Sequence, residues 1–215
     1  MGMPVMIIGK SGSGKTTSLR NFAEKEIYLI KVLKKPLPFR KEFESTFETE
    51  DYDRVLKALE KSGKNSIVID DAGYLLTNHF MNGHMNTGSG NGVFALYNEI
   101  ADRFWRLVEY VINVLPPEKI VYFMMHEDRN DLGEVKPKTI GKLLDEKVCL
   151  EGMFTIVLRC MKDGGRHVFK TKTNGADVTK TPIGMFEEDE IENDLKKVDD
   201  TIRSFYRITE GGTKE

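Results

Sequence analysis

A glycine-rich stretch near the start of the chain has the residue types needed to hold a phosphate group. It follows a short apolar run at residues 3–8, and the residues we expect to bind nucleotide are Gly9, Lys10, Ser11, Gly12, Ser13, Gly14, Lys15, Thr16 and Thr17. This spacing is that of the P-loop. Its glycines let the backbone approach a ligand closely, and its N–H groups point at one anion. Lys15 would reach the β- and γ-phosphates of a nucleotide, and the Thr16 hydroxyl would hold Mg²⁺.

A pair of aspartates after the apolar run at 67–69 supplies the carboxylates that this chemistry requires. A buried parallel strand delivers its last residues to the sheet edge where a P-loop also lies. Asp70 would hold Mg²⁺ through its hydration shell, and Asp71 would orient or deprotonate the attacking water. Asp71 can do so only if the strand ends at Asp70, because adjacent strand residues point to opposite faces. Rival water-activating carboxylates are Glu42, Glu44, Glu48 and Glu50.

A histidine follows the continuous apolar run at 120–125, which is typical of a central parallel strand. A polar side chain at the end of such a strand, beside the P-loop, can sense the γ-phosphate. His126 is therefore the third candidate catalytic residue, with Lys15 and Asp71. The alternative is that His126 is a capping or loop histidine.

The order of expected elements indicates an α/β fold. Strands at 3–9, 27–33, 66–70 and 119–125 alternate with helices at 15–25, 51–62 and 93–115, a pattern that gives a mostly parallel sheet with right-handed crossovers. A polar residue on the strand after the aspartates fits P-loop ATPases in which that strand lies between the other two site strands.

The second half of the chain predicts an antiparallel edge to this sheet. Residues 154–160 and 166–172 read as two strands joined by an Asp-Gly type turn. A final amphipathic helix is expected over 187–206. We predict one P-loop ATPase domain over residues 1–208, with a disordered tail at 209–215.

Composition limits the classes of partner. The net charge of −2 provides no global basic field for nucleic acid, so any such contact must be local. Cys149 and Cys160 lack metal-ligand spacing. No signal peptide or membrane-length apolar run is evident, and we expect a cytoplasmic protein. No guanine-reading Asn-Lys-x-Asp segment is present, which argues against a GTPase.

Several sequence blocks resemble the small RecA-like P-loop ATPases of tailed bacteriophages, which are related to recombination and single-strand-annealing ATPases. They are residues 35–39 (KPLPF), 67–75 (IVIDDAGYL), 121–127 (VYFMMHE), 138–147 (KTIGKLLDEK), 151–158 (EGMFTIVL) and 180–186 (KTPIGMF). The resemblance spans roughly residues 3–206. It implies a RecA-like sheet flanked by helices, ATP and Mg²⁺ as ligands, a phage origin in the bacterial cytoplasm, and a role in DNA recombination or replication.

The resemblance also implies contacts with single-stranded DNA. In RecA-like proteins the loops after the two site strands contact DNA, and by position these correspond to residues 77–92 and 127–139. Here 77–92 is polar and glycine-rich and reads as a mobile loop. Lys136 and Lys138 would contact phosphates, and Phe80 would stack on a base. In a homo-oligomer, basic residues act across subunits; the candidates are Lys170, Lys172 and Lys180.

These expectations converge on an ATPase acting on single-stranded DNA. Because loss of a cation supplied by a neighbouring subunit can cost about 10³–10⁵ in rate, an isolated monomer should turn over slowly. Two alternatives stay open: a nucleoside or nucleotide kinase that clamps the transferred phosphate with Arg129, Arg159 or Arg166, and a nucleotide-gated switch that binds a partner without meaningful hydrolysis.

Overall fold

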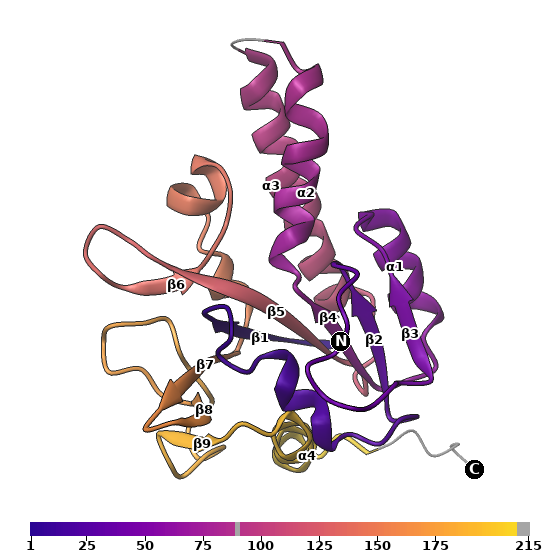
Figure 1. Cartoon of the computed structure of the whole chain (residues 1–215), viewed down its shortest axis with the longest axis vertical. Coiled ribbons are helices and arrows are strands. Elements are labelled where there is room, and N and C mark those ends of the chain that lie inside the picture. The colour runs from indigo at the N-terminus through magenta and orange to yellow at the C-terminus, as the bar shows by residue number, and fades with distance from the viewer. Residues whose placement is uncertain (89–90, 210–215) are drawn as a thin grey trace.

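The computed structural model describes residues 1–88 and 91–209, and within them nine strands form one sheet. The strands are β1 (Met3–Gly9), β2 (Ile27–Lys31), β3 (Ser45–Glu48), β4 (Ser66–Asp70), β5 (Ile120–Arg129), β6 (Val135–Pro137), β7 (Ile156–Asp163), β8 (Arg166–Lys170) and β9 (Glu190–Glu192). Their order is β3-β2-β4-β5-β1-β7-β8-β9, and β6 pairs with β5 outside this path (Figure 1).

The helices are α1 (Tyr52–Lys61), α2 (Gly73–Gly83), α3 (Asn91–Asn113) and α4 (Leu195–Tyr206) among the described residues. Shorter helical turns are 3₁₀ segments at Thr16–Asn21, His84–Asn86 and Leu150–Met153, and a π turn at Leu143–Lys147. The predicted α/β class, with a mostly parallel sheet flanked by helices and antiparallel strands at one edge, is confirmed.

The centre of the sheet is parallel, and β5 lies between β1 and β4 as predicted. Gly9 is in register with His126 across β1 and β5, and Ile69 is in register with Phe123 across β4 and β5. Parallel strands end at the same edge, so this order brings Gly9, Asp70 and His126 together.

Alternate residues of the central strands face two separate hydrophobic clusters, as the two-residue period of a strand requires. Met6 and Ile8 of β1 belong to the cluster that includes α1, α2 and α3. Val5 and Ile7 belong to the cluster that includes Leu19 and α4. The sheet is therefore covered on both faces, which explains why β1, β4 and β5 are almost wholly apolar.

The segment predicted as a mobile loop at 77–92 is helical over most of its described part, so this prediction was wrong. α2 and α3 form a hairpin that projects away from the sheet (Figure 1). Leu76 and Phe80, four residues apart, lie on the side of α2 that packs with the core that holds Leu96 and Ile100 of α3. Tertiary packing of this stripe outweighs the polar composition; residues 89 and 90 lie outside the described part.

Other predicted boundaries shifted for local reasons. The helix expected at 15–25 is a short 3₁₀ turn, and β5 continues to Arg129 and pairs with β6, so residues 127–139 form a hairpin. The helix expected from 187 begins at Leu195, because Asp194 caps it by accepting hydrogen bonds from the N–H groups of Lys196 and Lys197. The residues before this cap form β9.

Two further predictions concern the C-terminal tail and membrane-spanning segments. Residues 210–215 of the predicted tail lie outside the described part of the chain. In the described part, every helix is too short or too polar to cross a bilayer.

A buried polar network fastens α4 to the amino ends of β4 and β5. Asp199, which is 3% exposed, accepts hydrogen bonds from the Tyr122 hydroxyl at 2.7 Å and the Ser66 hydroxyl at 2.8 Å. Arg203 Nε donates to the other carboxylate oxygen at 2.7 Å, and Arg203 Nη2 donates to Ser66 at 2.8 Å. The carboxylate is thus fully paired, as a buried charge requires.

We predict that Asp199→Ala lowers the free energy of unfolding by about 3–5 kcal/mol, because it leaves Arg203 and Tyr122 buried without their partner. Asp200→Ala, on the exposed side of the same helix, should change it by less than about 0.5 kcal/mol. Urea unfolding measures both. Equal effects of the two substitutions would contradict the structural role of the network.

Candidate nucleotide site

The loop after β1 is folded around the side chain of its own lysine. Lys15 Nζ donates to the Gly9 carbonyl at 2.7 Å and to the Lys10 carbonyl at 3.0 Å. Gly12 and Gly14 adopt φ of 76° and 104°, a region that favours glycine. Lys15 is 6% exposed, and burial lowers the pKa of its ammonium group although Cys160, Asp71 and Asp70 offset part of the effect. Two carbonyls of the loop therefore fix the position of the Lys15 ammonium group.

Two glycines of the loop are required by close neighbours. A Cβ atom at Gly9 would collide with the Cys160 carbonyl and lie 2.6 Å from Ser13 Oγ. A Cβ atom at Gly14 would lie 2.9 Å from His167 Nδ1. The edge strands β7 and β8 thus press against the loop and leave no room for side chains there.

The candidate magnesium ligands are in direct contact. Thr16 Oγ1 donates to Asp70 at 2.9 Å from Oδ1 and 3.1 Å from Oδ2. Asp70 is 7% exposed, and burial, with the neighbouring Asp71 charge, raises the pKa of its carboxyl to about 6. A hydroxyl and a carboxylate beside a phosphate loop are the oxygen donors that fit Mg²⁺, which keeps several waters and takes one or two protein ligands.

Asp71 meets the condition set for a water-activating residue, because β4 ends at Asp70. Asp71 has φ of 59°, rare for a residue with a side chain, and it lines the same cleft as Lys15 and Thr16. Its carboxylate lies 2.5 Å from Lys35 Nζ and 3.7 Å from His126 Nε2. The unusual backbone conformation therefore coincides with a carboxylate in the cleft.

His126 lies on β5 next to Gly9 of the loop. Burial and the Lys15 charge lower the pKa of the imidazole, so it is neutral at neutral pH. Its ring packs edge-on against Tyr74, with 5.8 Å between the centroids. A neutral histidine here has a ring N–H available for a phosphate oxygen.

These side chains line a cleft of about 260 Å³, and it brings most of the predicted site residues together. The lining residues are Ser11, Gly12, Gly14, Lys15, Thr16, Thr17, Lys35, Pro36, Pro38, Asp70, Asp71, His126 and His167. The rival water-activating carboxylates are not among the described residues that line this cleft; they are Glu42, Glu44, Glu48 and Glu50. Glu48 instead pairs with Lys31 at 2.9 Å, and Glu50 accepts from Asn78 at 2.6 Å.

Sequence reasoning missed a group of residues that hold the loop from the antiparallel edge. His167 Nδ1 donates to the Ser13 carbonyl at 2.6 Å, and Cys160 Sγ donates to the same oxygen at 3.1 Å. Asn193 Nδ2 donates to Cys160 Sγ at 3.2 Å. No local pattern could have found them, because each lies more than a hundred residues from the loop.

Lys35 was also missed. The basic, proline-containing run at 34–41 reads as a surface connection in the sequence. The structure places Lys35, Pro36 and Pro38 on the wall of the cleft. Only the pairing of β2 with β4 brings this run beside Asp71.

A model of the AAA domain family matches residues 1–183, from β1 through the antiparallel hairpin and the whole cleft. The chain belongs to the AAA domain family. With its P-loop, this AAA domain is an ATPase. A search of curated proteins finds no match.

One similar solved structure is the X-ray structure of the Legionella pneumophila ATPase DotB. The identity is 9%, the TM-score is 0.32, and the similarity covers 74% of this chain and 41% of that chain. The chain thus spans less than half of that protein.

Two of the three lysines predicted to act on a second subunit, Lys170 and Lys172, form ion pairs within this AAA domain. Lys170 Nζ lies 2.8 Å from Asp177, and Lys172 Nζ lies 3.0 Å from Asp189. Lys180 pairs through its backbone with Val157. Lys170 is mostly buried, with its side chain 12% exposed, so an action across subunits would first require breaking a buried ion pair.

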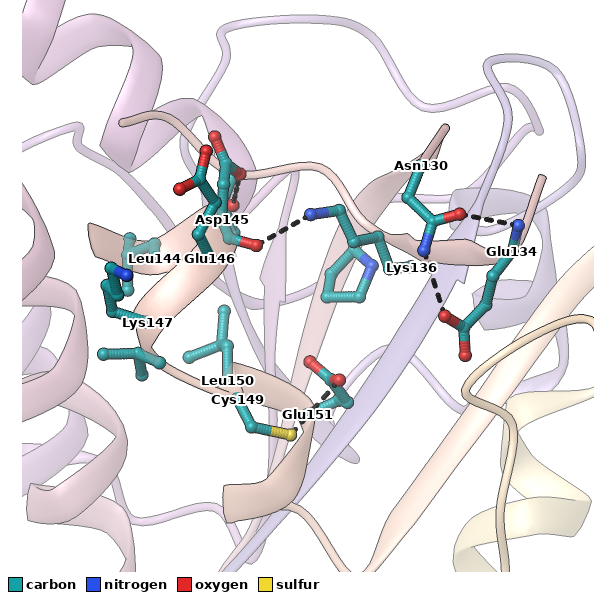
Figure 2. A pocket seen from close by; sticks show the side chains of 13 residues that line it. Asn130, Glu134, Lys136, Leu144, Asp145, Glu146, Lys147, Cys149, Leu150 and Glu151 are labelled. Carbon is teal, nitrogen blue, oxygen red and sulfur yellow. Dashed lines mark hydrogen bonds between the residues drawn. The ribbon is translucent and has the colours of Figure 1, made fainter. Parts of the chain in front are cut away.

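A second hollow lies away from the cleft, between the β5–β6 hairpin and the turns at 143–151 (Figure 2). Several of its polar side chains are hydrogen-bonded within the hollow. Lys136 Nζ donates to the Asp145 carbonyl at 3.0 Å, and Asn130 Nδ2 donates to Glu134 at 3.0 Å. Cys149 Sγ donates to Glu151 at 3.2 Å. Glu146 and Lys147 also line this hollow, and Lys136 could contact a ligand only by giving up its hydrogen bond to Asp145.

We predict that Asp70→Asn stabilises the nucleotide-free protein at pH 7. The folded pKa of Asp70 is about 6, above the unfolded value of 3.8, so the folded state binds the proton more tightly. This contribution is present below pH 4 and is lost as pH rises through 6. The loss is at most about 3 kcal/mol.

The measurement is urea unfolding in EDTA between pH 4 and 7.5. The difference in unfolding free energy, Asp70→Asn minus wild type, should grow over this interval. A difference that stays constant with pH would show that the buried carboxylate carries no such cost.

Proposed function

We propose that this AAA domain hydrolyses ATP in the cleft with Mg²⁺ bound beside Thr16 and Asp70. The observation that carries the proposal is the hydrogen bond between these two residues, which joins the phosphate loop to the carboxylate strand. In P-loop ATPases the loop hydroxyl and this aspartate hold the same ion. Thr16 and Asp70 would hold the ion, which would supply positive charge to offset the negative charge that develops on the phosphates.

Each protein group then has a role set by its position. The N–H groups of the loop receive the phosphates, and Lys15 turns from the Gly9 and Lys10 carbonyls to phosphate oxygens. Asp71 accepts the proton of the attacking water, while the bond from the γ-phosphorus to the bridging oxygen breaks. Neutral His126 donates to a γ-phosphate oxygen. Positioning and charge stabilisation supply most of the catalysis.

We propose further that hydrolysis is coupled to single-stranded DNA in bacteriophage recombination or replication. The sequence blocks that resemble phage ATPases support this. So does a hollow of about 440 Å³ beside the cleft, which shares Ser11 and His126 with it and is lined by Lys10, Tyr74 and Lys138. Two ammonium groups could contact the phosphates of a single DNA strand, and an aromatic ring could stack on a base.

The charge distribution favours the β5–β6 hairpin over the α2–α3 hairpin as the DNA contact. Residues 65–102 contain no lysine or arginine, so α2 and most of α3 cannot neutralise phosphates. Phe80 is also occupied, because it stacks on His84 and Tyr97 with centroids 5.1 Å away in each case. Lys136 and Lys138 are therefore the proposed phosphate contacts, and Phe80 is not.

The kinase alternative finds little support in Arg159, one of its three candidate arginines. Arg159 donates to Glu127 at 2.8 and 3.0 Å and lies 3.4 Å from Asp177. These bonds hold its guanidinium and leave it little capacity to clamp a transferred phosphate.

The direct test is ATP hydrolysis with and without single-stranded DNA. We expect slow, Mg²⁺-dependent release of phosphate that DNA accelerates. Lys15→Ala should abolish it and weaken ATP binding, because the loop loses its phosphate cation. Binding without hydrolysis under all conditions would favour the nucleotide-gated switch, and phosphate transfer to a nucleoside would favour the kinase.

For DNA binding, we predict that Lys136→Ala with Lys138→Ala reduces the slope of log affinity against log salt by about 1.4, since each phosphate contact contributes about 0.7 for a single strand. The matched control is Lys57→Ala with Lys61→Ala, which removes the same charge from α1. Fluorescence anisotropy of a labelled oligonucleotide measures both. Equal losses in the two variants would mean that the contact is not local to the hairpin.

A further inference from the structure

An ion pair between Lys35 and Asp71 lies on the wall of the cleft. Lys35 Nζ lies 2.5 Å from Asp71 Oδ2. Although burial opposes it, the hydrogen bond and charge of Asp71 raise the pKa of Lys35, so the ammonium group is charged at neutral pH. The pair places a cation in the same cleft as the loop that would hold the phosphates.

The two partners differ in how freely they can move. The Asp71 side chain is 6% exposed and sits on a backbone with φ of 59°. The Lys35 side chain is 56% exposed and is carried by a flexible four-carbon stem. Pro36 and Pro38 restrict the backbone next to it and line the cleft with it. The base of Lys35 is therefore held while its ammonium group can change partner.

The charges in the cleft favour a cation beside Asp71. Asp70 and Asp71 are both buried there, and Lys15 is the other lysine on the wall of the cleft among the described residues. A nucleotide would add negative charge next to Asp71. Of the three lysines expected to act from another subunit, Lys170 is paired with Asp177 and Lys172 with Asp189.

We propose that Lys35 is a catalytic residue that supplies, within the same chain, the cation for the γ-phosphate. In the absence of nucleotide it neutralises Asp71; with ATP bound, its ammonium group donates to a γ-phosphate oxygen and leaves Asp71 Oδ2 to the attacking water. This rests on the proposed ATP hydrolysis. An ammonium group has three donors, so it can pass from one oxygen to the other without losing all contact with either.

The step is balanced without any further reactant. The water oxygen forms a bond to the γ-phosphorus as the bond to the β,γ-bridging oxygen breaks. The water proton goes to the Asp71 carboxylate, and ADP and phosphate leave. Lys35 keeps its protons throughout and stabilises the charge on the transferring group.

The test compares Lys35→Met with Lys34→Met, a neighbouring lysine that does not line the cleft. We expect kcat of Lys35→Met to fall about 10²–10³-fold, as on loss of one transition-state donor. The Kd for ADP should stay within about threefold, because ADP lacks the γ-phosphate. Lys34→Met should match wild type, and Lys35→Arg should recover part of the rate because it restores the charge.

A second readout isolates the transferring phosphoryl group. ADP with aluminium fluoride should form a tight complex with wild type and Lys34→Met but not with Lys35→Met. Mixing Lys35→Met with Lys15→Ala should restore no activity, because both residues act in one chain. Circular dichroism and thermal unfolding of Lys35→Met check that the fold is kept.

Unchanged or faster hydrolysis by Lys35→Met would overturn the proposal, as would recovery of activity in the mixture or an equal loss of ADP affinity. Failure of the proposed function has a different signature: wild type and Lys34→Met would bind ATP and release no phosphate.

Discussion

The site depends on a carboxylate buried against a hydroxyl, Asp70 against Thr16. A buried carboxylate is costly unless it is paired, and here it accepts from Thr16 Oγ1 at 2.9 Å. The contact exists because β5 lies between β1 and β4 and all three strands run parallel. The sheet thus holds together two sequence segments that are 54 residues apart. Burying the Asp70 carboxylate costs free energy, and binding of Mg²⁺ and nucleotide would offset that cost.

The shape of the phosphate loop depends on the far end of the chain as well. Ser13 accepts from His167 and Cys160, and Asn193 supports Cys160 in turn. Arg20 Nη1 donates to the Asn193 carbonyl at 2.5 Å and ties the 3₁₀ turn after the loop to the end of β9. The antiparallel edge is therefore part of the site's scaffold, since it fixes the Ser13 carbonyl of the loop. The buried network around Asp199 attaches α4, which follows this edge, to the central strands.

The sequence predicted correctly those elements whose signal lies in a short local pattern. The loop's spacing, the apolar runs of β1, β4 and β5, and the hairpin turn at 162–165 each carry their own signal, and the strand order followed from the position of His126. It did not predict the features that depend on packing between segments far apart in the chain. Residues 77–86 are helical because Leu76 and Phe80 pack with the core that includes α3. Lys35 is in the site because β2 pairs with β4. Its partner Asp71 was a candidate, but no pattern links the two.

We propose above all that Thr16 and Asp70 hold one Mg²⁺ beside the phosphates. A double-mutant cycle tests it, with Thr16→Val, Asp70→Asn and the double variant, and calorimetric ATP affinity measured with and without Mg²⁺. The account predicts that each single variant loses most of the Mg²⁺-dependent part of the affinity and that the double variant loses little more. Independent, additive losses, or a Mg²⁺-dependence that survives in Asp70→Asn, would contradict it.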